Sequence, residues 1–551
     1  MRLRALRLPL TILTSAVLAA CGGGDTTQPA ALSQGDRAVQ GGQAITVADT
    51  GSSATAASAT ASANSDATTG TQRLVLGAAA PAALAAAAPP PVPLVPVPND
   101  EGASLTFSTV GSIDTTNPFF QPFGNGRSCA SCHQPDNGWS IGPDKLLTRF
   151  NNSNGADPVF RPNDGAVSPL APVDTLDQKR AAYSMLLTKG LIRVGLPMPA
   201  NAEFTLIKVD DPYNYASAKE LSLFRRPLPT TNLKFLSTVM WDGRETIADA
   251  TSTMCVKDVR PVQCFASIDT GLQHQSNDAV RGHAEAAQDL TAAQQRAIVD
   301  FEKTLFTAQT TSIDAGSLTD AGAQGGPLHL AQLDFHYGIN DVQSGDYQNG
   351  AAFNRNVFNL FGAWRNLANP VPPPPPQRGR PAPPPPPPPS AINLARASIA
   401  RGEQIFNNRP FNITGVAGFN DDLHRTLQRG TCASCHDTPG IGSHSVTRTF
   451  NTGVSDGSRR TADMPLYTLR NNSTGEVVTT SDPGAAMLSG KWKDIGKFKV
   501  PSLRGIESRS PYFHNGMVHQ IEDVVAFYNQ RFAIGLTTQE AADLAAFLKA
   551  L

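Results

Sequence analysis

Two segments of the chain carry the hydrophobic pattern of an amphipathic helix. Each opens with a capping box, in which a threonine is followed three residues later by Gln or Glu, at 291–294 and at 537–540. Apolar residues then recur at the spacing of one helix face. These positions are Ile298, Phe301 and Leu305 in the first segment and Leu544, Phe547, Leu548 and Leu551 in the second. Strand patterns are weak and scattered, so the pattern predicts a mainly α protein with long loops.

Two low-complexity segments divide the chain. Residues 22–102 are rich in Ala, Ser, Thr, Gly and Pro, a composition that cannot bury a core. At 370–389, two polyproline runs predict an extended, solvated linker, with an SH3-type ligand as the alternative. We therefore expect a signal peptide at 1–20, a disordered tether at 21–102, an N-terminal domain at 103–369, a polyproline linker at 370–390 and a C-terminal domain at 391–551.

The N-terminus has the pattern of a secretion signal. Arg2, Arg4 and Arg7 precede an apolar run at 8–18 that is too short to span a bilayer. The letters LAAC that end at Cys21 resemble a bacterial lipoprotein box, which predicts cleavage before this cysteine and attachment of lipid to it. The alternative is an ordinary signal with an incidental cysteine. Both predict export, and we expect a periplasm-facing lipoprotein of the bacterial envelope, held in the outer membrane.

The charge of the chain gives no sign of a polyanionic partner. Its 551 residues include 45 Lys and Arg against 46 Asp and Glu. Such a balance creates no field that favours nucleic acid or an anionic membrane surface. We therefore expect no nucleic acid partner and membrane contact only through the lipid.

Two CxxCH motifs are the strongest chemical signal. They are Cys129-Ala-Ser-Cys132-His133 and Cys432-Ala-Ser-Cys435-His436. Thiols three positions apart can each bond a haem vinyl group, and the next imidazole can bind the iron. A thioredoxin-like redox pair does not need the adjacent His, and zinc sites combine such cysteines with further Cys or His at regular spacing. The motifs predict two covalently bound haem c groups, one in each domain.

Two further cysteines, Cys255 and Cys264, are close in sequence. In an oxidising compartment such a pair favours a disulfide that closes a short loop. Two buried free thiols are the alternative.

Three more segments carry a family resemblance. They are Phe123-Gly-Asn-Gly-Arg-Ser-Cys129, Met240-Trp-Asp-Gly-Arg244, and Phe498-Lys-Val-Pro-Ser-Leu-Arg504 with Pro511-Tyr-Phe-His-Asn-Gly516. Together with the CxxCH motifs, their order resembles that of the diheme cytochrome c peroxidase and MauG superfamily. The resemblance implies two cytochrome c-like haem domains, of which the N-terminal one reacts with peroxide and the C-terminal one transfers electrons. It also implies that Trp241 lies between the haems as an electron relay, for which ordinary packing of a tryptophan is the alternative.

The resemblance implies two catalytic residues on the open side of the first haem. The family places a Gln and, ten positions later, a Glu there, and Gln275 and Glu285 have this spacing. A carboxylate over the iron can move a proton between the two oxygens of peroxide. His283, which is close in sequence, is an alternative candidate for this proton transfer, and His274 is a weaker one. Alternatively, Glu285 is a solvated residue on a helix face without a catalytic role. No His lies between His133 and His274 to close the first iron as in better-known peroxidases, so we expect it to be open.

The resemblance also implies a ligand for the second iron. The family's position falls at Tyr528, fourteen residues after His514, and a phenolate there favours ferric iron. Met517 and His519 are the rivals, and a buried core tyrosine is the further alternative. His514 itself is expected to accompany this haem without binding its iron. A calcium ion often lies between the domains of such enzymes, but Arg226-Pro227 stands where its asparagine ligand is usual, which puts calcium in doubt.

The function implied is a peroxide-dependent oxidoreductase. Hydrogen peroxide would react at the N-terminal haem, and electrons would enter through the C-terminal one. They would come from a small periplasmic cytochrome c or cupredoxin, or from an oxidisable protein or organic substrate as in MauG. A tethered electron carrier without turnover is a different alternative, and oxygen-dependent cleavage of a polymer is a third.

Overall fold

The computed structural model describes residues 94–246, 254–256, 263–265, 268–369 and 387–551, without the side chains of 254–256 and 263–265. The chain divides into two units, Met1–Leu84 and Ala85–Leu551, and every described residue belongs to the second unit. The predicted signal peptide, Cys21, most of the tether and most of the polyproline linker lie outside the described residues and stay predictions. Among the helices that are described, none combines the length and the apolar character that a membrane crossing requires.

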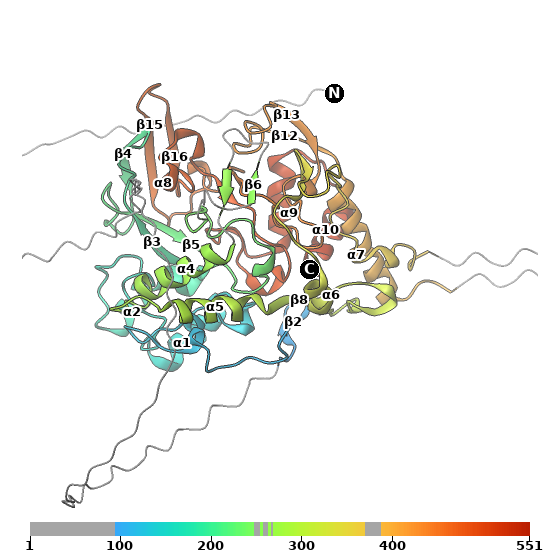
Figure 1. Ribbon diagram of the computed structural model, residues 1–551, viewed down its shortest axis with the longest axis horizontal. Helices are drawn as coiled ribbons and strands as arrows, with labels where there is room; N and C mark the ends of the chain where they lie inside the picture. Colours follow the sequence, from blue (N-terminus) through green and yellow to red (C-terminus); the bar gives the residue numbers. More distant parts are fainter. Residues whose placement is uncertain (1–93, 247–253, 257–262, 266–267, 370–386) are drawn as a thin grey trace, which may run out of the picture. The chain divides into compact units, whose positions relative to one another are not determined.

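Ten α-helices lie in the described residues (Figure 1). They are α1 Pro143–Ser153, α2 Leu176–Ala182, α3 Ser184–Lys189, α4 Ile268–Gly282, α5 Ala292–Lys303, α6 Gly326–Gln332, α7 Ala391–Asn408, α8 Ala486–Ser489, α9 Ile521–Arg531 and α10 Thr538–Lys549. Both helices predicted from the hydrophobic pattern are confirmed, as α5 and α10, and each begins with the predicted capping box. Leu305 lies beyond α5 and Leu551 beyond α10, so the last apolar position of each pattern is outside the helix.

Seventeen strands occur in the same described ranges. They are β1 Val97–Asn99, β2 Gly102–Ser108, β3 Ile192–Leu196, β4 Phe204–Asp210, β5 Leu221–Arg225, β6 Met254–Val256, β7 Gln263–Phe265, β8 Leu305–Ser312, β9 Gly316–Ser317, β10 Ile339–Asp341, β11 Gly345–Asp346, β12 Phe411–Thr414, β13 Leu427–Gly430, β14 Thr449–Phe450, β15 Leu466–Asn471, β16 Val477–Thr480 and β17 Phe498–Lys499. They form small sheets, the largest in the order β1-β2-β8-β9. The pairing of β1 and β2 brings residues 97–102, at the end of the predicted tether, into this sheet.

The expectation of a mainly α protein was wrong. Among the described residues 32% are helical and 18% lie in strands or bridges. Most of the described strands are only two to five residues long, too short for an alternating pattern to stand out. All five residues of β5 are buried, so this strand has no solvent-exposed face that would give an alternating pattern.

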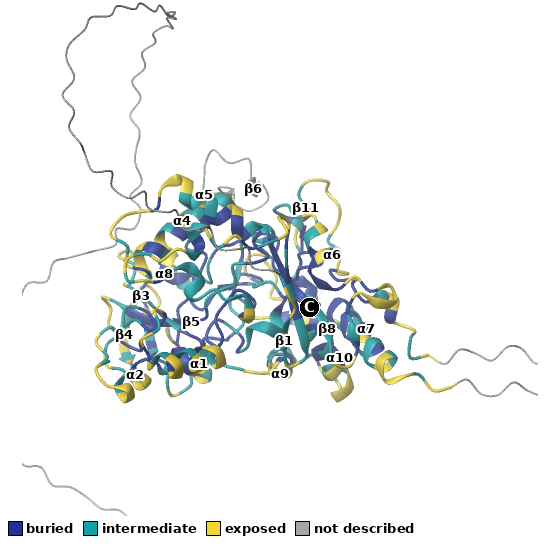
Figure 2. Cartoon of the chain, turned by 90° about the horizontal axis from the view of Figure 1, so that it is seen from below, coloured by how far each residue is buried: buried dark blue, intermediate teal, exposed yellow. Residues whose placement is uncertain are grey.

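One sheet joins the two predicted domains. Strand β4 of the predicted N-terminal domain pairs antiparallel with β15 of the predicted C-terminal domain. Strand β16 pairs with the other edge of β15, so the strand order is β16-β15-β4. The core beneath it includes Phe204, Leu221 and Tyr467. The Tyr467 hydroxyl donates to the Ser222 carbonyl over 2.7 Å, which ties β15 to β5. The two domains therefore share a core, and β5, which leads to the candidate site, is held by residues of both. Figure 2 shows β5 and β8 largely buried, whereas α1 and α2 carry exposed stretches.

Helices α7 and α10 pack closely around the second CxxCH motif. Phe406 of α7 and Phe547 of α10 have ring centroids 5.7 Å apart, and Phe406 also lies 6.0 Å from the His436 ring. The two helices approach at Gly402, where a Cβ atom would overlap the carbonyl of Asp543 and lie 2.7 Å from the Phe547 Cβ. Only glycine permits this approach.

We predict that Gly402→Ala destabilises the protein. A methyl group at this position forces α7 and α10 apart, an overpacking cost of about 1–3 kcal/mol that outweighs the better helix propensity of alanine. Denaturant unfolding of the haem-loaded protein measures the change. Gly282→Ala, where no described atom lies within 4 Å of the added Cβ, is the matched control. Equal unfolding midpoints for the two variants would contradict the packing argument.

Candidate functional site

Both CxxCH motifs open onto one interior cavity. Its walls are mainly apolar and come from both predicted domains. The lining includes the four motif cysteines and two motif histidines together with Trp241, Gln275, His514 and Tyr528. Of the residues predicted to act in catalysis or to hold haem, only Glu285 is absent from this lining.

The two motifs fold in the same way. Each cysteine pair begins a short 3-10 helix, Cys129–Ser131 in one and Cys432–Ser434 in the other. The serine hydroxyl of each motif accepts from the backbone N–H three residues earlier, over 2.9 Å at Ser131 and 3.0 Å at Ser434. The turn places both thiols of each motif on the cavity wall. Burial raises the pKa of Cys132 to about 11 and that of Cys432 to about 12, so these sulfurs remain uncharged thiols until they are bonded.

Both motif histidines are oriented as iron ligands. Nδ1 of His133 donates to the Trp139 carbonyl over 3.0 Å, and Nδ1 of His436 donates to the Gly442 carbonyl over 2.5 Å. The acceptor follows the histidine by six residues in each case. This bond leaves Nε2 as the lone-pair nitrogen, which is how proteins orient ligand imidazoles. Burial lowers the pKa of both histidines to about 4, so both are neutral and able to bind a metal.

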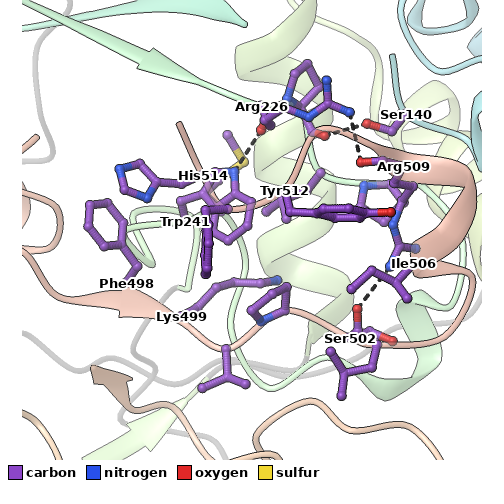
Figure 3. Close-up of a pocket in the computed structure, with 18 of the residues that line it drawn as sticks. Ser140, Arg226, Trp241, Phe498, Lys499, Ser502, Ile506, Arg509, Tyr512 and His514 are labelled. Atoms are coloured by element: carbon purple, nitrogen blue, oxygen red, sulfur yellow. Dashed lines mark hydrogen bonds between the residues drawn. The ribbon is translucent and has the colours of Figure 1, made fainter. Parts of the chain in front are cut away.

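The cavity also has a cationic edge, drawn in Figure 3. Arg226, Lys499 and Arg509 line it, and none of them forms an ion pair with a described carboxylate. Lys499 Nζ donates to the Thr238 carbonyl over 2.9 Å, and Arg509 Nη2 to the Ser502 carbonyl over 3.0 Å. Burial lowers the pKa of Lys499 to about 7 and that of Arg226 to about 9. An apolar cavity with such an edge suits a flat apolar ring that carries acidic side chains, and haem is of this kind.

The same edge does not fit calcium. Nη1 of Arg226 donates to the carbonyls of Lys189 and Gly190, and Nη2 to those of Arg509 and Ser510. Calcium binds through carbonyl and carboxylate oxygens. Here the carbonyl oxygens surround a guanidinium, a cation that belongs to the chain itself.

Trp241 is held by a closed ring of contacts between the two domains (Figure 3). Its indole N–H donates to the Arg226 carbonyl over 2.7 Å, and its own carbonyl accepts from the Lys499 N–H over 2.8 Å. The Arg226 N–H donates to the His514 carbonyl over 2.7 Å. His514 stacks on Phe498 with ring centroids 3.8 Å apart, and its ring lies 6.2 Å from that of Trp241. Trp241 and His514, for which the resemblance implied separate roles, are thus neighbours in one unit.

A buried ion-pair network supports this ring. Arg225 Nη1 contacts Asp242 over 2.5 Å, and its Nε and Nη2 contact Asp482 over 2.7 and 2.9 Å. All three side chains are buried. Burial raises the pKa of Asp242, but the charges of Arg225 and Arg244 outweigh this effect and bring it down to about 2. The network fixes the residue that follows Trp241 against the second domain.

The structure separates the two residues predicted for the open side of the first haem. Gln275 lines the cavity, but Glu285 is exposed and its Oε2 accepts from Asn125 Nδ2 over 2.8 Å. Helix α4 ends at Gly282, so Glu285, ten residues after Gln275, lies beyond the helix and on the surface. His283, the rival, lines the cavity.

A buried carboxyl group that was not predicted from the sequence, Glu302, also lies at the cavity. It lines the cavity on α5, and burial raises its pKa to about 8. Its charge is the second cause, after burial, of the raised pKa of Cys129. A signal existed, because Glu302 lies four residues after Ile298 on the apolar face of the predicted helix.

The structure distinguishes the three candidate ligands of the second iron. Tyr528 of α9 lines the cavity, whereas Met517 and His519 do not. Burial, followed by the charges of Cys435 and Cys432, raises the pKa of the Tyr528 hydroxyl. The phenol therefore lies close to the second pair of thiols.

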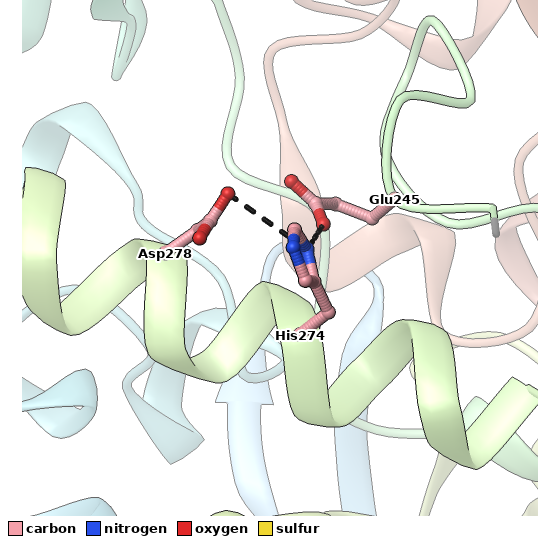
Figure 4. A group of neighbouring side chains, drawn as sticks. All are labelled: Glu245, His274 and Asp278. Atoms are coloured by element: carbon pink, nitrogen blue, oxygen red, sulfur yellow. Dashed lines mark hydrogen bonds and ion pairs between the residues drawn. The ribbon is translucent and has the colours of Figure 1, made fainter. Parts of the chain in front are cut away.

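Other predicted residues lie away from the cavity. His274 is exposed on the outer side of α4, where its Nδ1 contacts Glu245 over 2.6 Å and Asp278 over 3.8 Å (Figure 4). Cys255 and Cys264 are opposite each other in the β6–β7 pair, but their side chains lie outside the description and the disulfide stays a prediction.

Comparison with known proteins supports the resemblance seen in the motifs. The cytochrome-c peroxidase IdrP2 of Pseudomonas sp. (strain SCT) is 35% identical over 131 residues, which are 22% of this chain and 35% of that protein. The cytochrome-c peroxidase IdrP1 of Denitromonas iodatirespirans is 33% identical over 139 residues, 22% of this chain and 36% of that protein. The chain thus matches about a third of the length of these curated relatives. The recognition made from the motifs is confirmed. Over the matched part, the chain is similar to cytochrome-c peroxidases, as the motifs predicted.

Two further comparisons add no detail to this similarity. No family model matches the chain. A solved structure of a MauG-like protein associated with microbial copper homeostasis aligns with 79% of this chain and 87% of its own, at 14% identity and a TM-score of 0.30. The similarity to cytochrome-c peroxidases implies haem c as the cofactor, and the motif geometry described above fits it.

We predict that Arg225→Leu destabilises the protein by about 3–5 kcal/mol, because it leaves Asp242 and Asp482 buried without their shared cation. Arg296→Leu, which removes a surface ion pair with 55% of the arginine side chain exposed, should cost at most about 1 kcal/mol. Denaturant midpoints of the two haem-loaded variants provide the measurement. A small loss in Arg225→Leu would show that the network does not hold the domains.

Proposed function

We propose that the protein is a diheme peroxidase that reduces hydrogen peroxide at the N-terminal haem and receives electrons through the C-terminal haem. The observation that carries the proposal is the common cavity, with both CxxCH motifs on its wall and Trp241 fixed between the domains. The peroxidase names of the curated relatives agree with it.

Each haem would be held by its own motif. Cys129 and Cys132 would bond the first haem and Cys432 and Cys435 the second, with His133 and His436 as iron ligands. Bound haem supplies an iron that accepts peroxide and passes electrons one at a time. Arg226, Lys499 and Arg509 would neutralise haem propionates, because these buried cations have no described carboxylate partner.

Three further side chains that line the cavity would each have a separate role in the reaction. Gln275 would bind peroxide by hydrogen bonds at the first haem, where the chain offers no early histidine to close the iron. Trp241 would connect the haems electronically, since its indole is fixed at both its N–H and its backbone carbonyl. His514 would hold the Trp241 ring in place through their edge contact.

A second candidate function is a MauG-like oxidase of a protein or organic substrate. Tyr528 favours it, because this phenol lies beside the second pair of thiols and a phenolate ligand stabilises oxidised iron. The two candidates differ in the donor, which is a small periplasmic cytochrome c or cupredoxin in the first and the oxidised substrate in the second. We place either enzyme at the periplasmic face of the cell envelope, anchored by lipid on Cys21.

The function is tested by stopped-flow spectroscopy of matured protein whose pyridine haemochrome reports two haem c groups per chain. One equivalent of hydrogen peroxide should change the haem spectrum rapidly, and reduced cytochrome c should restore the resting spectrum. Restoration by an organic donor alone would assign the MauG-like activity. A chain with both haems that binds no carbon monoxide when reduced and ignores peroxide would be an electron carrier.

We predict that Tyr528→Phe changes the absorption spectrum of the second haem and raises its reduction potential, because loss of an anionic ligand no longer favours ferric iron. Met517→Leu and His519→Gln, whose side chains lie outside the cavity lining, should leave both properties as in the wild type. Spectroelectrochemistry measures both properties. An unchanged Tyr528→Phe spectrum would remove the assignment of Tyr528 as ligand.

A further inference from the structure

Helix α4 presents one face to the cavity. The residues of this face are three or four positions apart, as helix geometry requires. They are Leu272, Gln275, Ser276, Ala279 and Val280, and the series continues to His283 directly after the helix. His274 and Asp278 occupy the outer face (Figure 4). His283 therefore lies on the same side as Gln275 and lines the cavity, whereas Glu285 does not.

His283 is held at the cavity by a buried carboxylate. Its Nδ1 lies 2.5 Å from Asp164 Oδ2, and Arg127 Nη1 lies 2.5 Å from Asp164 Oδ1. Burial raises the pKa of Asp164, but its bonds to His283 and Arg127 outweigh this effect, so the pKa is lowered and the group is a carboxylate. Arg127 precedes Cys129 by two residues, which ties this arrangement to the first haem motif.

The geometry leaves Nε2 of His283 available for proton transfer. When Nδ1 donates to Asp164, the neutral ring has its lone pair on Nε2. The side chain is 39% exposed and lines the cavity, so a molecule as small as hydrogen peroxide can reach it. His283 lines the same cavity as His133, and its carbonyl accepts from Arg127 Nη1 over 3.0 Å, which places it near the first motif.

The two carboxyl groups nearby are less suited to the task. Glu285 is exposed and bonded to Asn125 outside the cavity lining. Glu302 lines the cavity, but with a pKa of about 8 it holds its proton at neutral pH and cannot accept another.

We propose that His283, oriented by Asp164, is the acid–base residue that cleaves peroxide at the first haem. The inference rests on the proposed function. Nε2 takes a proton from one oxygen of hydrogen peroxide and returns it to the other oxygen, which leaves as water when the O–O bond breaks. The two electrons come from the haem groups and their donor, and with two protons from solvent the peroxide is converted to two water molecules.

The test compares holoprotein variants in single-turnover stopped flow with hydrogen peroxide. In His283→Gln the second-order rate constant should fall about 10²–10⁴-fold, the usual contribution of a positioned acid–base group. His274→Gln on the outer face of α4 and Glu285→Gln should react like the wild type. Asp164→Asn should react more slowly than the wild type, because it no longer fixes the tautomer of His283.

A second variant separates chemistry from folding. His283→Gly should regain part of its rate when free imidazole is added, an effect that a structural role would not produce. Cyanide binding to the resting protein shows whether the first haem site is intact in each variant.

The outcomes separate this inference from the proposed function. A wild type with two haems that ignores peroxide would overturn both. A reactive wild type with an equally reactive His283→Gln would overturn the role of His283 alone. Loss of rate in Glu285→Gln with a normal His283→Gln would return the role to Glu285.

Discussion

The arrangement of the candidate site depends on one buried charge. Arg225 lies at the end of β5 and contacts Asp242 from its own domain and Asp482 from the other. A buried cation is costly unless its partners surround it, so each carboxylate must stay where Arg225 is. Because Asp242 follows Trp241 directly, this requirement fixes the position of the tryptophan between the two haem motifs.

The cavity itself is unbalanced in charge. Arg226, Lys499 and Arg509 lie on its edge with carbonyl partners and without a described carboxylate. Burial of cations in this way is unfavourable for the polypeptide alone, and an anionic cofactor would relieve it. Haem c, proposed for the two CxxCH motifs, would bring such negative charge to this edge through its propionates.

The guanidinium of Arg226 has a structural role as well. It donates to carbonyls at 189–190 and 509–510, which come from the two predicted domains. Where a metal ion would gather oxygen ligands, this chain uses a side chain that cannot dissociate. The backbone N–H of Arg226 donates to the His514 carbonyl, which connects the same residue to the ring around Trp241.

The sequence by itself determined the chemistry and some local structure. Haem attachment requires two cysteines and a histidine at a fixed local spacing, and a capping box acts within a few residues. The haem motifs and helices α5 and α10 could therefore be predicted. The order of the motifs along the chain also indicated the family resemblance. Only the tertiary structure decided that β4 pairs with β15, that Glu285 turns to the surface while His283 and Glu302 face the cavity, and that Tyr528 rather than His519 lies beside the second thiols. The physical reason is that these outcomes depend on where helices end and on which distant segments share a buried space, and neither is encoded in local spacing.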